Sequence, residues 1–195
     1  MIFIRPQDVV LLLKLGIEGS TATTLAALGA QLGISAAEIH GAMNRASLAS
    51  LLDRETRKPR IHNLLEFLEH GIKYAFVSRR GELTRGLPTA YSAPPLSDVL
   101  MQGPVARMFL NPAAEPPSSY ETSIDPYAPI AVVWPDPEGK VRGESLEPLY
   151  PAAVGAARRD PKLYECLALV DALRIGRARE KKLAIAFLTE RLRPA

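Results

Sequence analysis

The 195-residue sequence has a single cysteine, Cys166, which excludes an internal disulfide and any zinc site built from several cysteines. Long apolar runs are also missing: the longest, Val9–Leu13, is far shorter than the ~20 residues that a membrane-spanning helix needs. The sequence does not open with a basic segment ahead of a long apolar stretch, so we expect no signal peptide. These absences predict a soluble protein of a reducing compartment, the cytoplasm, with no membrane contact.

Motifs of the common enzyme classes are absent as well. The sequence has no Walker loop, no G-x-G-x-x-G and no G-x-S-x-G. Its three histidines, His40, His62 and His70, lack the H-E-x-x-H spacing of a zinc site. Cys166 lies in the apolar pattern Leu163–Leu167, which is typical of a buried structural thiol rather than a nucleophile. We therefore expect no catalytic residues, no cofactor and no metal, and a protein that is not an enzyme.

The overall composition is that of a folded domain. Hydrophobic residues make up 47% and charged residues 23% of the chain, which excludes a disordered or collagen-like protein. The net charge of +3 is unevenly distributed: residues 1–80 and 151–195 are basic, whereas residues 81–150 carry nine acidic and four basic residues. This middle segment also holds 12 of the 17 prolines. Basic ends around an acidic, proline-rich middle favour contacts of the ends with a polyanion.

Two helices are predicted in the first 33 residues. The first begins at Pro6, because proline is favoured in the first turn, and ends at Gly16 or Gly19. The second spans Thr24–Leu32, where leucines recur on one face at a helical spacing. Gly33 ends it, since a residue without Cβ adopts the left-handed conformation easily.

A capping box predicts the start of a third helix. The Ser35 hydroxyl accepts from the backbone N–H of Glu38, and the Glu38 carboxylate reaches back to the N–H of Ser35. The inward positions of this helix are Ile39, Met43 and Ala46. Its outer face carries Ala37, His40, Gly41 and Asn44.

Shorter elements follow. Two apolar segments around the charged stretch Asp53–Arg60 predict a small β-hairpin. Asn63 is expected to cap a short helix, Leu64–His70, in which His70 stands at the C-terminal end before Gly71. The alternation in Ile72–Val77 predicts a strand.

The second half of the chain has less regular patterning. Residues 81–150 contain no long periodic segment, only short apolar pieces between prolines and glycines: Leu96–Met101, Val105–Leu110 and Ile130–Trp134. Beyond them, a helix that Asp160 or Pro161 opens keeps an amphipathic spacing up to Gly176. A last helix, Arg179–Leu192, is expected to present one apolar side, made of Leu183, Ala186, Phe187 and Leu192. These two helices either complete the core or form a dimer interface.

A helix-turn-helix pattern runs through Leu25–Ser35 and continues in the apolar positions Ile39, Met43, Leu51 and Leu52. The pattern resembles winged helix-turn-helix regulators, most closely the MarR-like type, over the first 75 residues. In that fold a three-residue turn brings two short helices together, so that a small residue, here Ala26 or Ala27, lies between them. The third helix enters the DNA major groove and the charged hairpin is a wing that contacts phosphates.

The resemblance implies roles for individual side chains. Asn44 reads an adenine edge, and His40 or Arg45 contacts a base or a phosphate. The helix N-terminus at Ser35 holds a further phosphate through backbone N–H groups. The basic residues of the wing neutralise phosphates. The implied DNA-binding residues are Ser35, Ala37, His40, Gly41, Asn44, Arg45, Arg54, Arg57, Lys58 and Arg60.

The expected fold is therefore α+β and mostly α, with an N-terminal winged helix-turn-helix, a proline-rich middle segment and two C-terminal helices. Residues 1–80 form the DNA-binding domain, and residues 81–195 serve a partner, an effector or dimerisation. The expected function is sequence-specific binding of double-stranded DNA in transcriptional regulation, as a homodimer because half-sites usually come in pairs.

A second interpretation is a protein-interaction module, such as an antitoxin-like subunit. In that case the acidic residues 81–150 wrap a basic partner protein while the N-terminal part binds DNA or the partner. A ligand-sensing regulator would instead have an apolar pocket in this segment, near Trp134 and Tyr150. The sequence leaves both open.

Overall fold

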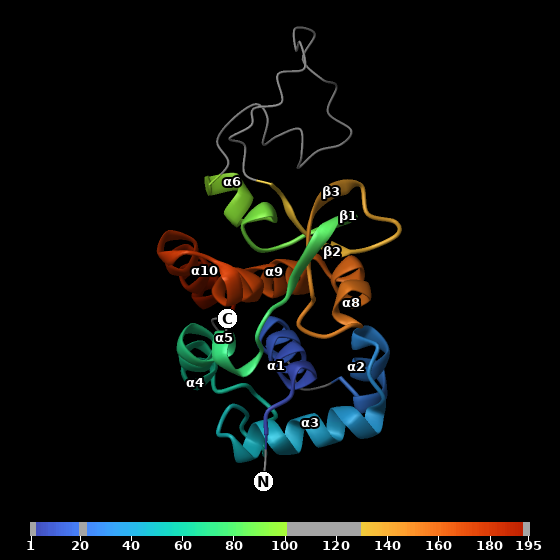
Figure 1. The fold of residues 1–195 in the computed structure, drawn as a ribbon. Helices are drawn as coiled ribbons and strands as arrows, with labels where there is room; N and C mark the ends of the chain where they lie inside the picture. Colours follow the sequence, from blue (N-terminus) through green and yellow to red (C-terminus); the bar gives the residue numbers. More distant parts are fainter. Residues whose placement is uncertain (1–2, 20–22, 101–129, 193–195) are drawn as a thin grey trace, which may run out of the picture.

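The computed structural model describes residues 3–19, 23–100 and 130–192 (Figure 1). Most of this part is helical and the rest includes a small three-stranded sheet, so the α+β, mostly α class is confirmed. The elements in chain order are α1 (Pro6–Glu18), α2 (Leu25–Leu32), α3 (Ala36–Leu48), α4 (Ile61–Glu66), the π-helical turn η1 (Phe67–Gly71), α5 (Ile72–Ala75), β1 (Arg80–Pro88), the 3-10 turn η2 (Ala90–Ser92), α6 (Leu96–Leu100), β2 (Val132–Pro135), β3 (Val141–Leu146), α8 (Ala153–Arg159), α9 (Pro161–Ile175) and α10 (Ala178–Arg191).

Helix α9 lies at the centre of the molecule. Asp160 caps its N-terminus by accepting from the backbone N–H groups of Lys162 and Leu163, as expected. Every residue from Cys166 to Leu173 is buried, so the helix is enclosed on all sides and the amphipathic pattern expected for it is wrong. It contacts α1, α5, α8, α10 and η2. Of the two roles considered for it, α9 completes the core.

One hydrophobic core extends from Val9 in α1 to Leu192 after α10. It includes residues on both sides of the expected boundary at residue 80, among them Leu64 and Trp134. Of the apolar side expected for α10, Leu192 is buried and Leu183 and Phe187 pack partly buried against the core, whereas Ala186 is exposed. The fully buried positions within the helix are the neighbouring Ala184 and Leu188.

The first three helices agree with the sequence prediction. Gly19 and Gly33 end α1 and α2 with φ of 61° and 67°, in the left-handed region that glycine adopts without strain. Thr24 caps α2 by accepting from the N–H of Ala27. In α3 the expected inward residues, Ile39, Met43 and Ala46, are buried.

The segment after α3 differs from the prediction. The helix begins at Ile61 and continues through η1 to Ala75, so no strand forms at residues 72–77 and His70 does not end the helix. Gly71 keeps a right-handed conformation, and the Phe67 ring packs against it: a Cβ there would lie 2.9 Å from the ring. Asn63 is not a cap, because its amide donates to the carbonyl of Ser50 at 2.8 Å.

The sequence of that segment contains a helical pattern of apolar residues that the strand prediction overlooked. Leu64, Leu68 and Ile72 follow one another at i, i+4 and i+8, and all three are fully buried. The apparent alternation of Ile72–Val77 hid this longer period, because within that segment Ile72 is buried whereas Tyr74 and Val77 are exposed.

A closed three-stranded barrel lies toward the end of the molecule opposite to α3 (Figure 1). Strand β1 pairs antiparallel with both β2 and β3, which pair parallel with each other. Closure needs glycine at two strand positions, because a Cβ on Gly86 or Gly143 would lie 2.0 or 2.3 Å from a carbonyl oxygen of β2 or of the residue before it. The expected apolar segment Val105–Leu110 lies outside the described residues.

A buried carboxylate attaches this barrel to α9. Asp171 accepts hydrogen bonds from the Trp134 indole at 2.6 Å, the Thr89 hydroxyl at 2.9 Å and the Arg174 guanidinium at 2.7 Å. Burial raises the pKa of Asp171, and the Arg174 charge and the three hydrogen bonds act against this shift. Thr89 directly precedes η2, Trp134 belongs to β2, and Arg174 belongs to α9 like Asp171 itself. The Asp171 side chain therefore joins three segments of the chain.

Replacing Asp171 by Ala is expected to lower the free energy of unfolding by ~3–5 kcal/mol, since it leaves Arg174 buried without its carboxylate. The measurement is urea unfolding followed by circular dichroism. The matched control on the same helix is Glu165→Ala, which removes a partly exposed pair with Arg191 and should cost at most ~1 kcal/mol. Equal losses in the two variants would contradict the role of Asp171.

Candidate nucleic-acid interface

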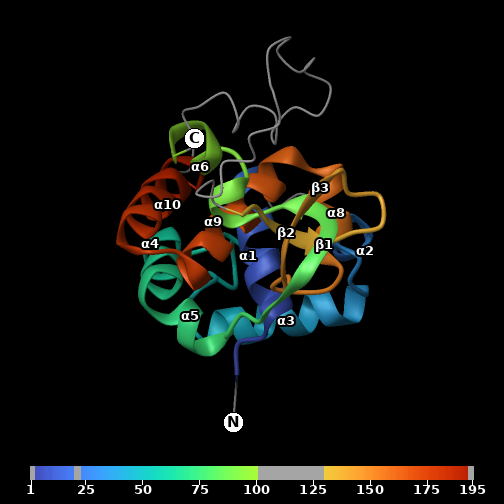
Figure 2. The ribbon, with the colours of Figure 1, turned by 45° about the horizontal axis from the view of Figure 1, so that its top comes forward.

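Helix α3 lies at one end of the molecule, packed against α1 and α2 (Figures 1 and 2). Its inner side is apolar and buried, and its outer side is open: Ala37 and His40 are exposed and Gly41 and Asn44 are half-buried. The side chains on this outer side are short and mostly uncharged. A second macromolecule can therefore approach the helix axis closely along this side.

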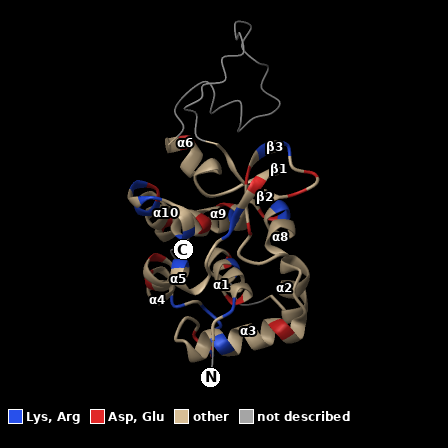
Figure 3. Cartoon of the chain, viewed as in Figure 1, with Lys and Arg blue, Asp and Glu red and all other residues tan. Residues whose placement is uncertain are grey.

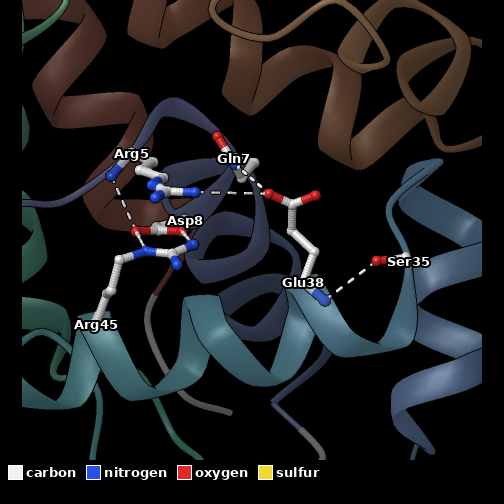
Figure 4. Close-up of polar contacts among 6 residues, drawn as sticks. All are labelled: Arg5, Gln7, Asp8, Ser35, Glu38 and Arg45. Atoms are coloured by element: carbon white, nitrogen blue, oxygen red, sulfur yellow. Dashed lines mark hydrogen bonds and ion pairs between the residues drawn. The ribbon is translucent and has the colours of Figure 1, made fainter.

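Two polar contacts fix α3 on α1 (Figure 4). The fully buried Asp8 carboxylate accepts from Nε and Nη2 of Arg45 at 2.8 and 2.6 Å, and from the backbone N–H of Arg5 at 2.9 Å. Two turns earlier on α3, Glu38 accepts from the amide of Gln7 at 2.7 Å. Both contacts join α1 to α3, so they set the position of α3 along α1 as well as the distance between the two helices.

Arg45 does not have the role that the sequence suggested for it. Its guanidinium is turned inward onto Asp8, whose hydrogen bonds raise the pKa of Arg45, and only 19% of its side chain is exposed. Reaching a base or a phosphate would require breaking a bidentate pair with a buried carboxylate, which costs several kcal/mol. Arg45 is a structural residue that positions α3.

The predicted capping box is half formed. The Ser35 hydroxyl accepts from the Glu38 N–H at 3.2 Å, as expected, and caps α3. The Glu38 carboxylate does not complete the box because it is engaged by Gln7 (Figure 4). The first turn of α3 thus presents the exposed residues Ser35 and Ala37 to the solvent.

The predicted hairpin after α3 is present in minimal form, with one bridge between Leu52 and Pro59. Two backbone hydrogen bonds extend it, from Asp53 N–H to Lys58 and from Arg60 N–H to Leu51. The Asp53 carboxylate accepts from the N–H and the hydroxyl of Thr56, and these bonds lower the pKa of Asp53. The carboxylate thereby orders the turn.

The basic side chains of this turn point outward. Arg54, Arg57 and Lys58 are exposed, and within the described part of the chain their side chains have no hydrogen bond or ion pair. Arg60 is 3.7 Å from Asp53 and half of its side chain is exposed. Three cations are therefore available at the tip of the hairpin beside α3.

A shallow depression of about 170 Å³ joins the hairpin to the outer side of α3. Its polar lining comes from His40 and Asn44 of α3 and from Arg54 and Arg57 of the turn, and Asn44 Nδ2 lies 3.4 Å from His40 Nδ1. Its apolar lining consists of Leu25, Met43 and Leu52, which are not among the DNA-binding residues predicted from the sequence. The volume is below that of most small-molecule sites, so the depression is a feature of an open surface.

No family model, curated protein or solved structure matches the chain. No helix of the described residues has the length and apolar character to cross a membrane. In the same residues no three His, Cys, Asp or Glu side chains gather as metal ligands. Cys166 is fully buried, and burial raises the pKa of its thiol to about 12, which keeps it protonated.

A double-mutant series tests how α3 is positioned. Asp8→Ala should lower the free energy of unfolding by ~3–5 kcal/mol, because Arg45 then loses its buried partner. Replacing the pair by apolar residues, Asp8→Leu with Arg45→Met, should recover most of that loss. Chemical unfolding of the wild type and the two variants measures both changes. A double variant that is less stable than Asp8→Ala would contradict an energetically coupled pair.

Proposed function

We propose that the protein binds double-stranded DNA, with the outer side of α3 in the major groove and the 53–60 turn on the adjacent phosphates. The observation that carries the proposal is the surface on which His40 and Asn44 meet Arg54 and Arg57. Groups able to hydrogen-bond to base edges lie there beside cations able to neutralise phosphates. In protein–DNA interfaces the first kind of contact gives sequence specificity and the second positions the protein on the duplex.

The dimensions of α3 suit a groove. Its 13 residues rise ~20 Å, and a helix of ~10–12 Å diameter fits the ~12 Å width of the major groove. The small residues Ala37 and Gly41 keep the outer side low, so that Asn44 and His40 are the side chains that project from it. In this proposal Asn44 pairs bidentately with adenine, and its amide nitrogen lies 3.4 Å from Nδ1 of His40.

The phosphate contacts come from the turn. Arg54, Arg57 and Lys58 have no side-chain partner among the described residues, and Arg60 can leave its long, exposed pair with Asp53 at little cost. In the regulatory function that we propose, two copies of the chain bind two half-sites one helical turn apart, as a homodimer.

The first test of phosphate contact is the double variant Arg57→Ala with Lys58→Ala. We expect weaker binding to every duplex and a salt slope flatter by about two units of log K per log salt, at ~0.9 per phosphate. Fluorescence anisotropy of labelled duplexes over a salt series measures both. Lys181→Ala with Lys182→Ala, which removes two charges from α10, should leave the slope unchanged; an equal change there would contradict a specific role for the turn.

Base reading is tested at Asn44. On the preferred duplex, obtained by selection from a random-sequence pool, Asn44→Ala should cost ~1–3 kcal/mol of binding free energy. On a scrambled duplex it should cost almost nothing, because non-specific binding rests on phosphates. Equal losses on the two duplexes would contradict the assignment of Asn44, and a wild-type protein that binds neither duplex at low salt would contradict the proposed function.

A further inference from the structure

A cavity of about 400 Å³ lies far from α3, where the start of β1, η2 and the end of α6 meet the corner between α9 and α10. Three arginines line it: Arg80, Arg177 and Arg179. The remaining wall is apolar or aromatic apart from Glu180, and consists of Tyr91, Leu100 and Ile175. Its volume falls within the range of small-molecule sites, ~300–1,000 Å³.

A tight corner brings two of the arginines to the cavity. Helix α9 ends at Ile175 and α10 begins at Ala178, with Gly176 between them. A Cβ on Gly176 would lie 2.3 Å from the carbonyl oxygen of Ala172, so the chain can turn this closely only at a glycine. Because the second helix starts at once, Arg177 and Arg179 both line the same cavity.

The two acidic side chains described near the arginines, Glu180 and Glu144, bind the backbone of Arg177 and the side chain of Arg80. Glu180 caps α10 by accepting from the backbone N–H of Arg177. Glu144 is 2.7 Å from Arg80, which it holds at the edge of the cavity with a side chain 40% exposed. Arg177 and Arg179 are exposed, and among the described residues their side chains make no hydrogen bond or ion pair. Two free guanidinium groups therefore face a cavity with one apolar wall.

We propose that this cavity binds a phosphorylated small molecule with a flat apolar ring. Arginine is suited to the phosphate, since its planar fork donates two parallel hydrogen bonds to neighbouring oxygens. Arg177 and Arg179 hold the phosphate, and the ring packs on Tyr91, Leu100 and Ile175, while Arg80 stays paired with Glu144 at the edge of the cavity. The Tyr91 hydroxyl donates to the carbonyl of Ile130 at 3.3 Å, which keeps the tyrosine at the wall.

The site is independent of the proposed DNA surface. Helix α6 contacts α10, and both views place α6 at the end of the molecule away from α3 (Figures 1 and 2). Lys and Arg residues occur at both ends in the charge view, so the cavity is distinguished by its shape and apolar wall rather than by charge alone (Figure 3).

Isothermal titration calorimetry of the full chain without DNA tests the site, with inorganic phosphate, ADP and adenosine as probes. We expect ADP to bind more tightly than phosphate, because it adds the ring contacts, and adenosine to bind weakly or not at all. Arg177→Ala with Arg179→Ala should weaken ADP binding by roughly tenfold or more, since charge-assisted hydrogen bonds to the phosphate are lost.

The matched control, Lys181→Ala with Lys182→Ala, removes the same charge from the same helix and should retain ADP affinity within about twofold, because long-range charge effects are screened. Circular dichroism checks that both variants are folded. Three results would overturn the proposal: neither ADP nor phosphate binds at millimolar concentration, both double variants lose affinity equally, or the arginine variant loses duplex DNA binding while it keeps ADP binding.

Discussion

The enclosure of α9 is the constraint on which the rest of the structure depends. Every residue of the helix from Cys166 to Leu173 is buried, so the carboxylate within this stretch, Asp171, must find all of its partners inside the protein. Trp134 and Thr89 supply two of them, and through these bonds the small barrel is fixed to the helix. The third partner, Arg174, also donates to the carbonyls of Phe76 and Glu147, which joins the end of the N-terminal half to the same point. This attachment packs the short strands of the barrel against a helix, which stabilises a small sheet.

Helix α1, which packs against α9, likewise combines a buried apolar stretch with polar contacts to other helices. Its run Val9–Leu13 is fully buried, and the charged residues on either side are satisfied by ion pairs with other helices. Lys14 reaches Asp160, the cap of α9, at 2.7 Å, and Asp8 reaches Arg45 of α3. Apolar contacts bring these helices together but do not depend on direction. The hydrogen-bonded ion pairs do, so they fix the rotation and the register of each helix against its neighbour. The position of α3, and with it the candidate DNA surface, follows from α9 through α1.

Local signals in the sequence predicted the helix ends well, because caps act within a few residues: Gly19, Thr24, Gly33 and Asp160 do what their types suggest. The errors come from tertiary packing. Residues 72–77 alternate like a strand, but Ile72 continues the buried row of Leu64 and Leu68. The barrel was missed because its strands are short and separated by 43 residues between β1 and β2, so no local pattern announces their pairing. At the candidate site, the exposed positions of α3 could be predicted from its period, whereas the loss of Arg45 to Asp8 could not, since the two residues are 37 positions apart.

The pairing of Arg45 with Asp8 shows why net charge is a poor guide to where an anion would bind on this protein. Arg45, Arg158, Arg174 and Arg191 all count toward the basic total, yet each is held by a carboxylate and acts as a structural bond. Cations without such partners occur on several surfaces, so freedom from pairing is not sufficient either. What sets the hairpin and the α9–α10 corner apart is that arginines without a partner among the described residues border a hollow formed by a second element, α3 in one case and η2 with β1 in the other. In the two functions that we propose, the guanidinium beside the hollow binds an anion, and neighbouring groups recognise what the anion is attached to: base edges at α3 and a ring at Tyr91. Under these proposals charge supplies the attraction at both places, and the shape beside it supplies the selectivity.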